Sequence, residues 1–130
     1  MSVDTRPNPR RVLVVDDEAY IGRIVQLKLE QGPYVVELAA NGRAALERLR
    51  SHDPLDLVLL DIMMPDGSGL DVLAAMRCLS HRRRTPVIML TAKGQETDRA
   101  EAARLGATDF LTKPFSPKKL LARIDELLHS

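Results

Sequence analysis

Polar side chains that could take part in chemistry follow several of the apolar runs in this sequence. Asp16 and Asp17 come after the first run, Asp61 after the third, Thr91 after the fourth, and Lys113 shortly after the last. Singly, each has a plainer interpretation, because acids and threonines often cap helices and a Lys-Pro pair is typical of a solvated loop. Their recurrence at the ends of successive runs indicates one shared site instead.

Carboxylates gathered at such a site would favour a bound cation. Neighbouring negative charges raise one another's pKa, and a divalent cation would remove that repulsion while a lysine would lessen it. A site made only of oxygen ligands suits Mg²⁺, with Mn²⁺ as a substitute, whereas zinc prefers His and Cys. The histidines lie away from the acidic run, so the sequence predicts a magnesium site.

The elements that must position these residues alternate along the chain. Segments of helical periodicity separate five short runs rich in β-branched residues or leucine, at 12–15, 34–38, 57–60, 87–90 and 110–111. This alternation is typical of an α/β domain with a parallel sheet between helices. Ligands of such sheets bind beyond the carboxyl ends of the strands, which is where the polar residues stand.

Two helical segments have wide apolar faces and one does not. Ile21, Ile24, Val25 and Leu29 form one stripe, and a leucine-rich stripe runs along residues 120–128. Both are expected to dock on the sheet. The segment 96–104 offers mainly alanines, so it should bury little surface.

The composition bounds the protein class. The chain has 130 residues, 45% hydrophobic and 28% charged, with a formal net charge of +1. This predicts one globular domain over residues 11–130, preceded by a flexible arm at 1–10, with no nucleic-acid binding by the domain itself. The apolar runs are far shorter than the ~20 residues of a membrane span, so we expect a cytoplasmic protein without membrane contact. Cys78 is the only cysteine and is expected to be a small buried side chain.

Four segments together resemble the signature segments of response-regulator receiver domains of two-component signalling. They are residues 12–18 (VLVVDDE), 59–67 (LLDIMMPDG), 87–92 (VIMLTA) and 106–115 (GATDFLTKPF). The resemblance covers residues 11–128, and the run 113–123 is similar to the winged-helix transcription-factor subfamily. It implies a flavodoxin-like, doubly wound sheet of five parallel strands in the order 2-1-3-4-5, with five helices.

By this resemblance, Asp61 is the phosphoacceptor, which takes a phosphoryl group from a histidine kinase or phosphotransfer protein. Asp17 and Asp61 would ligate Mg²⁺ directly, Asp16 through water, and Met63 through its backbone carbonyl. The protein would be a switch that assists its own phosphorylation and dephosphorylation, not an enzyme.

The resemblance also implies how the phosphoryl group is held and sensed. Lys113 and Thr91 would contact it, and the family carries a cis peptide before Pro114. Phe110 stands where the family has an aromatic residue whose rotamer follows phosphorylation, although a simple core role fits it equally well. A homodimer through the segment 96–104, the last strand and the last helix is a further possibility of the subfamily.

Two other functions compete with this interpretation. A Mg²⁺-dependent phosphatase with an aspartate nucleophile would need an acid two residues after Asp61, where this chain has Met63. A flavodoxin would need a phosphate-binding loop after the first strand, and the acids at 16–18 would repel a phosphate there. Both are disfavoured.

Overall fold

A parallel sheet forms the centre of the molecule. The computed structural model describes residues 9–64 and 67–129, so most of the predicted arm lies outside the described residues. Within those ranges the sheet has five strands in the order β2-β1-β3-β6-β7, all parallel. Their bounds are β1 Arg10–Val15, β2 Tyr34–Ala39, β3 Leu57–Asp61, β6 Val87–Thr91 and β7 Asp109–Thr112. In chain order this is 2-1-3-4-5, which confirms the predicted fold class.

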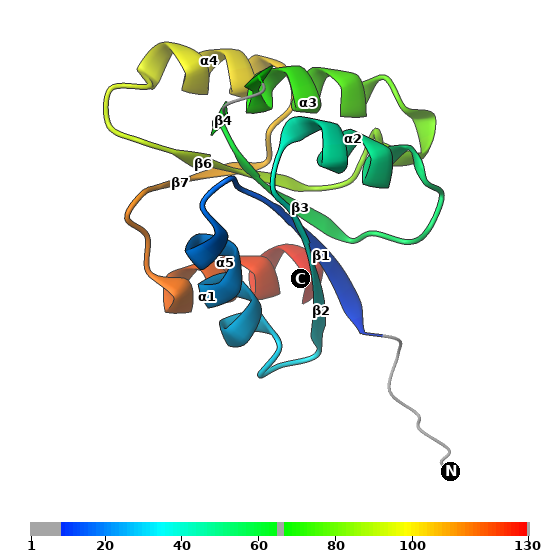
Figure 1. Ribbon diagram of the computed structural model, residues 1–130, viewed down its shortest axis with the longest axis vertical. Coiled ribbons are helices and arrows are strands. Elements are labelled where there is room, and N and C mark those ends of the chain that lie inside the picture. The colour runs from blue at the N-terminus through cyan, green and yellow to red at the C-terminus, as the bar shows by residue number, and fades with distance from the viewer. Residues whose placement is uncertain (1–8, 65–66, 130) are drawn as a thin grey trace.

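Helices cover both faces of the sheet. The helices α1 (Ala19–Leu29) and α5 (Pro117–His129) lie on one face, and α2 (Gly42–Arg50), α3 (Gly69–Arg77) and α4 (Glu96–Arg104) lie on the other (Figure 1). The described part of the chain therefore forms three layers. It contains no helix long and apolar enough to cross a membrane.

The alternation of side chains along the central strands builds two separate cores. In β1, Val12 and Val14 pack with buried residues of α1 and α5, whereas Leu13 and Val15 pack with those of α2, α3 and α4. The strands β3 and β6 alternate in the same way and are buried throughout. A strand buried on both faces must be apolar at nearly every position, which is why these segments read as continuous apolar runs.

The helices dock to different depths. In α1, Val25 and Leu29 are fully buried, but Ile24 is 43% exposed, so the predicted stripe is wrong at that residue. Leu120 and Ile124 anchor α5. In α4 only Ala102 is buried, as the alanine-rich sequence predicted.

Smaller features were not expected from the sequence. A two-stranded antiparallel sheet joins β4 (Met63–Met64) to β5 (Gly67–Ser68), and a 3-10 helix spans Ser80–Arg82. Arg77, at the end of α3, donates to the carbonyl oxygens of Arg82, Arg83 and Thr85 with one guanidinium nitrogen. Its other terminal nitrogen donates to the carbonyl of Gly106, in the turn after α4, at 2.7 Å. Arg77 thus ties two loops to the end of α3.

Candidate functional site

The predicted polar residues meet at one edge of the sheet. Because the strands are parallel, the ends of β1, β3, β6 and β7 lie together, which places Asp16, Asp61, Thr91 and Lys113 at the same edge. Asp61 is the last residue of β3. Asp16 directly follows β1, which is the strand paired with β3. The structure therefore brings these segments, which are distant in sequence, together at one edge of the sheet.

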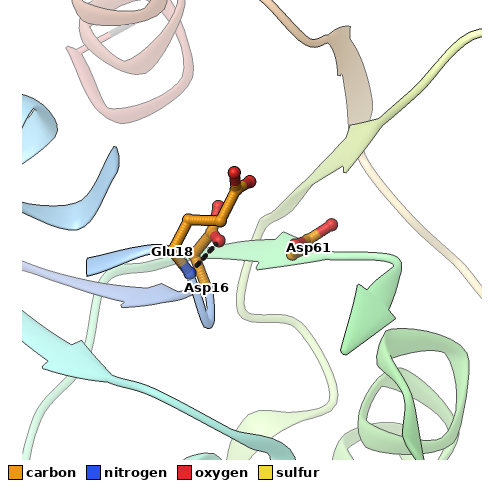
Figure 2. A group of neighbouring side chains, drawn as sticks. All are labelled: Asp16, Glu18 and Asp61. Atoms are coloured by element: carbon orange, nitrogen blue, oxygen red, sulfur yellow. Dashed lines mark hydrogen bonds between the residues drawn. The ribbon is translucent and has the colours of Figure 1, made fainter. Parts of the chain in front are cut away.

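Three carboxylates form a compact group in this site. One oxygen each from Asp16, Glu18 and Asp61 lies within 4.8 Å of the others. Figure 2 draws these three side chains. The backbone N–H of Glu18 donates to Asp16 Oδ1 at 2.9 Å, which fixes the orientation of that carboxylate. The other oxygen, Asp16 Oδ2, is buried, and its charged neighbour among the described residues is the Lys113 ammonium, 2.8 Å away. The buried carboxylate of Asp16 is therefore compensated by the charge of Lys113.

Lys113 is the cation of the site. Its Nζ lies 2.7 Å from Glu18 Oε1, 2.8 Å from Asp16 Oδ2 and 3.2 Å from Asp61 Oδ2. The backbone N–H of Lys113 donates to the Thr91 carbonyl at 2.7 Å, and the Lys113-Pro114 peptide is cis. The lysine therefore reaches the ends of both β1 and β3 from the end of β7.

The charges in the site are strongly coupled. Burial raises the pKa of Asp61 to about 6; the charge of Lys113 opposes this rise and that of Asp16 adds to it. The hydrogen bond and charge of Lys113 hold the pKa of Glu18 below its ordinary value. Burial alone would lower the pKa of Lys113, but its contacts with Asp16 and Glu18 more than offset burial and raise it. Lys113 is therefore positively charged at neutral pH.

Thr91 and Phe110 lie on β6 and β7, the strands that follow β3 in the sheet. The Thr91 hydroxyl is buried and donates to the Leu111 carbonyl of β7 at 3.4 Å, a contact that turns it toward β7. Phe110 is half-buried and packs against the core beneath α2, α3 and α4. The guanidinium carbon of Arg99, on α4, lies 5.0 Å from the centre of the Phe110 ring. This pairing is a cation-π contact between α4 and β7.

Some residues occupy places that the sequence did not predict. Asp17 is exposed and is not one of the three carboxylates in the group, whose third member is Glu18. The Met63 side chain is 59% exposed, while its backbone N–H donates to Asp61 Oδ1 at 3.3 Å. In the sequence, Glu18 is the last acid of the run 16–18. No pattern in the run distinguishes the acid that will face Lys113 from its neighbours.

Comparisons with known proteins agree with this geometry. Residues 12–125 match the family model of the response regulator receiver domain. The transcriptional regulatory protein ResD of Bacillus subtilis is 40% identical over 121 residues, which are 93% of this chain and 49% of ResD. The phosphate regulon transcriptional regulatory protein PhoB of Escherichia coli is 44% identical over 119 residues, 92% of this chain and 52% of PhoB. The chain spans about half the length of these two relatives.

Solved structures show the same fold. The chemotaxis protein CheY4 of Vibrio cholerae has a TM-score of 0.85 and 35% identity, and the match covers 92% of this chain and 99% of CheY4. The receiver domain of a sensor histidine kinase from Pseudomonas aeruginosa, described with a magnesium ion coordinated in its active-site cleft, has a TM-score of 0.84 and 27% identity over 94% of this chain and 99% of that domain. With the matched family model and the shared fold, this chain belongs to the response regulator receiver domains of two-component signalling.

Proposed function

We propose that Asp61 accepts a phosphoryl group from a phosphohistidine on a partner histidine kinase or phosphotransfer protein, and that the domain acts as a switch. The observation that carries the proposal is the placement of the Asp61 carboxylate, 3.2 Å from the Lys113 ammonium and within the compact acidic group. A nucleophilic carboxylate beside a cation and a set of oxygen ligands is the arrangement that phosphoryl transfer requires.

The transfer forms one bond and breaks another. A carboxylate oxygen of Asp61 forms a bond to phosphorus while the bond from phosphorus to the histidine nitrogen breaks, and the leaving imidazole takes up a proton. The product is an acyl phosphate. Because only the ionised carboxylate is a nucleophile, the pKa of about 6 for Asp61 matters: the residue is mostly ionised at neutral pH.

The donor set fits a hard divalent cation. The group offers carboxylate oxygens only, and its three acids face a single ammonium, that of Lys113. This excess of negative charge is what a divalent cation would offset. We assign Mg²⁺, with Mn²⁺ as a substitute, to Asp17, Asp61 and the backbone carbonyl of Met63 directly and to Asp16 through water. When bound, the ion supplies positive charge to the phosphoryl oxygens.

Lys113 and Thr91 would also contact the phosphoryl oxygens. The Lys113 ammonium is already within reach of Asp61 and carries its charge at neutral pH. The Thr91 hydroxyl, now bonded to the Leu111 carbonyl, would exchange this acceptor for a phosphoryl oxygen. This movement would open space that Phe110 can fill, changing the face formed by α4, β7 and α5.

The surface beside the site favours a protein partner. Tyr20 and Leu27 are each 61% exposed and Ile24 is 43% exposed, and their spacing places them on one side of α1, which begins just after the acidic residues. Large exposed apolar side chains gathered in this way are typical of protein interfaces. They support docking of the phosphohistidine donor against α1.

The phosphatase alternative has little support in the structure. The side chain two residues after Asp61 is the exposed and apolar Met63, which cannot transfer a proton. A switch that is phosphorylated and slowly dephosphorylated remains the better proposal.

Incubation with acetyl phosphate and Mg²⁺, followed by intact-protein mass spectrometry, tests the proposal. We expect the wild type and Asp71→Asn to gain the mass of one phosphoryl group, since Asp71 is an exposed aspartate on α3 outside the site. We expect Asp61→Asn to gain none, because an amide is not a nucleophile. Incorporation into Asp61→Asn at the wild-type level would refute Asp61 as the acceptor.

A further inference from the structure

Glu18 is the nearest partner of the lysine at the site. The Lys113 ammonium lies 2.7 Å from Glu18 Oε1 and 3.2 Å from Asp61 Oδ2, so the acid outside the sheet is closer to it than the phosphoacceptor is. The three carboxylate contacts of Lys113 also differ in burial. The side chains of Asp16 and Asp61 are 1% and 9% exposed, whereas that of Glu18 is 42% exposed.

Other contacts hold Glu18 in this orientation. Glu18 is the residue before α1, but its side chain makes no capping hydrogen bond to the helix. Its second carboxylate oxygen accepts a hydrogen bond from the Tyr20 hydroxyl at 3.2 Å. Both carboxylate oxygens of Glu18 are therefore engaged by Lys113 and Tyr20 and not by the start of the helix.

We infer that Glu18 is a positioning residue that holds the Lys113 ammonium in the unphosphorylated protein and must release it to the phosphoryl group. This inference rests on the proposed function of Asp61. An ammonium group has three N–H donors, and here three carboxylates surround it. Phosphorylation of Asp61 frees only the donor that faces this carboxylate, so a phosphoryl oxygen that needs a second donor has to displace Asp16 or Glu18.

Glu18 is the partner whose displacement costs least. Water can solvate its exposed carboxylate after release, whereas Asp16 would be left charged and buried without a partner. Glu18 therefore competes with the phosphoryl group for Lys113 and keeps the affinity of the site for that group lower than the lysine alone would give. Removal of its charge should strengthen binding of a phosphoryl mimic.

Titration with beryllofluoride at saturating Mg²⁺, followed by amide NMR, measures this competition. We expect the half-saturating beryllofluoride concentration of Glu18→Gln to fall about threefold to tenfold below that of the wild type, the scale of one ordinary hydrogen bond, because the Glu18 side chain is partly exposed. Tyr20→Phe, which removes only the hydroxyl that orients Glu18, should shift it in the same direction by less. The affinity for Mg²⁺ alone, measured by calorimetry, should change less than the affinity for beryllofluoride.

A double-mutant cycle separates an effect through Lys113 from general charge repulsion. In a Lys113→Ala background, Glu18→Gln should no longer strengthen mimic binding, because the competed ammonium is gone. Persistence of the full effect in that background would overturn the inference, as would unchanged or weaker mimic binding by Glu18→Gln. A loss of Mg²⁺ affinity larger than the change in mimic affinity would also overturn it, since Glu18 would then be a metal ligand.

Failure of the proposed function would give a different result from failure of the inference on Glu18. Wild-type protein that binds no mimic in the presence of Mg²⁺ would count against Asp61 as a phosphoacceptor. In that case, NMR relaxation of the Lys113 ε-methylene group in the metal-free protein still tests the positioning role. We expect greater mobility of this group in Glu18→Gln than in the wild type, and equal mobility would refute the contact.

Discussion

Gly69 lies directly against the backbone of Asp61. A Cβ atom at Gly69 would stand 2.0 Å from the Asp61 carbonyl oxygen, far inside any van der Waals contact. Its backbone N–H also donates to the carbonyl of Ile62, the next residue. The first residue of α3 thus fixes the chain at the end of β3, where the phosphoacceptor stands.

Gly69→Ala should therefore destabilise the protein and disturb the site. The added methyl group would force the end of β3 and the start of α3 apart, at a cost of about 2 to 4 kcal/mol in the free energy of unfolding, as measured with urea. Phosphorylation by acetyl phosphate should slow as well, because Asp61 moves with its backbone.

Gly22→Ala is the matched control for this substitution. Its new Cβ would meet only the flexible end of the Leu38 side chain, at 3.2 Å, and alanine favours the helix by about 1 kcal/mol. We expect little net change in its stability. Equal losses for the two variants would argue against a special role for Gly69.

Asp61→Asn should stabilise the metal-free protein in a pH-dependent way. Burial raises the pKa of Asp61 from its ordinary 3.8 to about 6, so between these values the folded protein holds a proton that the unfolded chain has lost. Wild-type stability from this group therefore falls as the pH rises through that window, by about 2 to 3 kcal/mol in total. The asparagine variant has no such loss.

Urea unfolding in the presence of a chelator at about pH 4.5 and about pH 7.5 measures this difference. The gain of Asp61→Asn over the wild type should be larger at the higher pH, where the wild-type carboxylate is ionised. The same gain at both pH values would show that the pKa of Asp61 is not raised in the folded protein.

Asp17→Asn separates metal binding from stability. Because Asp17 is exposed, we expect the free energy of unfolding without metal to change by less than about 0.5 kcal/mol. The affinity for Mg²⁺, measured by calorimetry, should fall by at least about tenfold, a loss that even indirect partners of a metal cause. Asp71→Asn is the charge-matched control and should bind Mg²⁺ as the wild type does. An unchanged affinity in Asp17→Asn would remove this residue from the ligand set.

Met63→Asn should shorten the lifetime of the phosphoryl group more than it alters stability. The Met63 side chain is 59% exposed next to the acceptor and cannot hydrogen-bond a water molecule, whereas an amide can orient the attacking water. Met63→Leu is the apolar control. The measurement is the decay of phosphorylated protein after removal of the donor, and identical decay in all three proteins would contradict the prediction.

Phosphorylation should produce a homodimer through the face of α4, β7 and α5. In the single chain, Arg123 of α5 pairs with Asp109 of β7 and lies 3.6 Å from Glu126. An exposed pair contributes only about 0.2 to 1 kcal/mol, so such charges would orient a two-fold interface more than they strengthen it. We expect a monomer that dimerises with beryllofluoride and Mg²⁺, and a severalfold weaker dimer for Arg123→Glu.

Sedimentation velocity with and without beryllofluoride tests the dimer. Lys28→Glu, at the end of α1 on another face, is the control for a change of net charge. The same monomer fraction in both conditions would exclude the switch to a dimer, without bearing on the phosphoacceptor.

The central strands and the site they carry were predictable because burial leaves few alternatives. The strands β3 and β6 are buried at every position, so only apolar residues can occupy them until the strand ends at Asp61 or Thr91. The same topology predicts that Lys113 meets these ends. What a strand pattern cannot supply is the direction of side chains in the loops beyond it.

The details that the sequence left open lie at such residues. Glu18 faces Lys113 while Asp17 faces solvent, a choice made by the backbone of the bend after β1 and not by the chemistry of two adjacent acids. Ile24 is exposed although apolar spacing favoured burial, because α1 presents only part of its apolar side chains to the sheet. Cys78 is exposed because α3 ends at Arg77 and leaves Cys78 in the turn that follows. Helical periodicity does not show how wide the contact with a neighbouring layer will be.

Arg77 makes the two ends of α4 mechanically unequal. The turn after α4 is attached through the Gly106 carbonyl to the end of α3, whereas the loop before α4 contains Gly94, with a φ of +86° and no atom within 4 Å of its Cβ position. The one buried residue of α4, Ala102, also lies near the attached end, so α4 is held most firmly at its C-terminal end. A rotation of α4 would therefore displace Glu96 further than Arg104. Glu96 is the end of α4 that is connected through a short loop to Thr91, the last residue of β6.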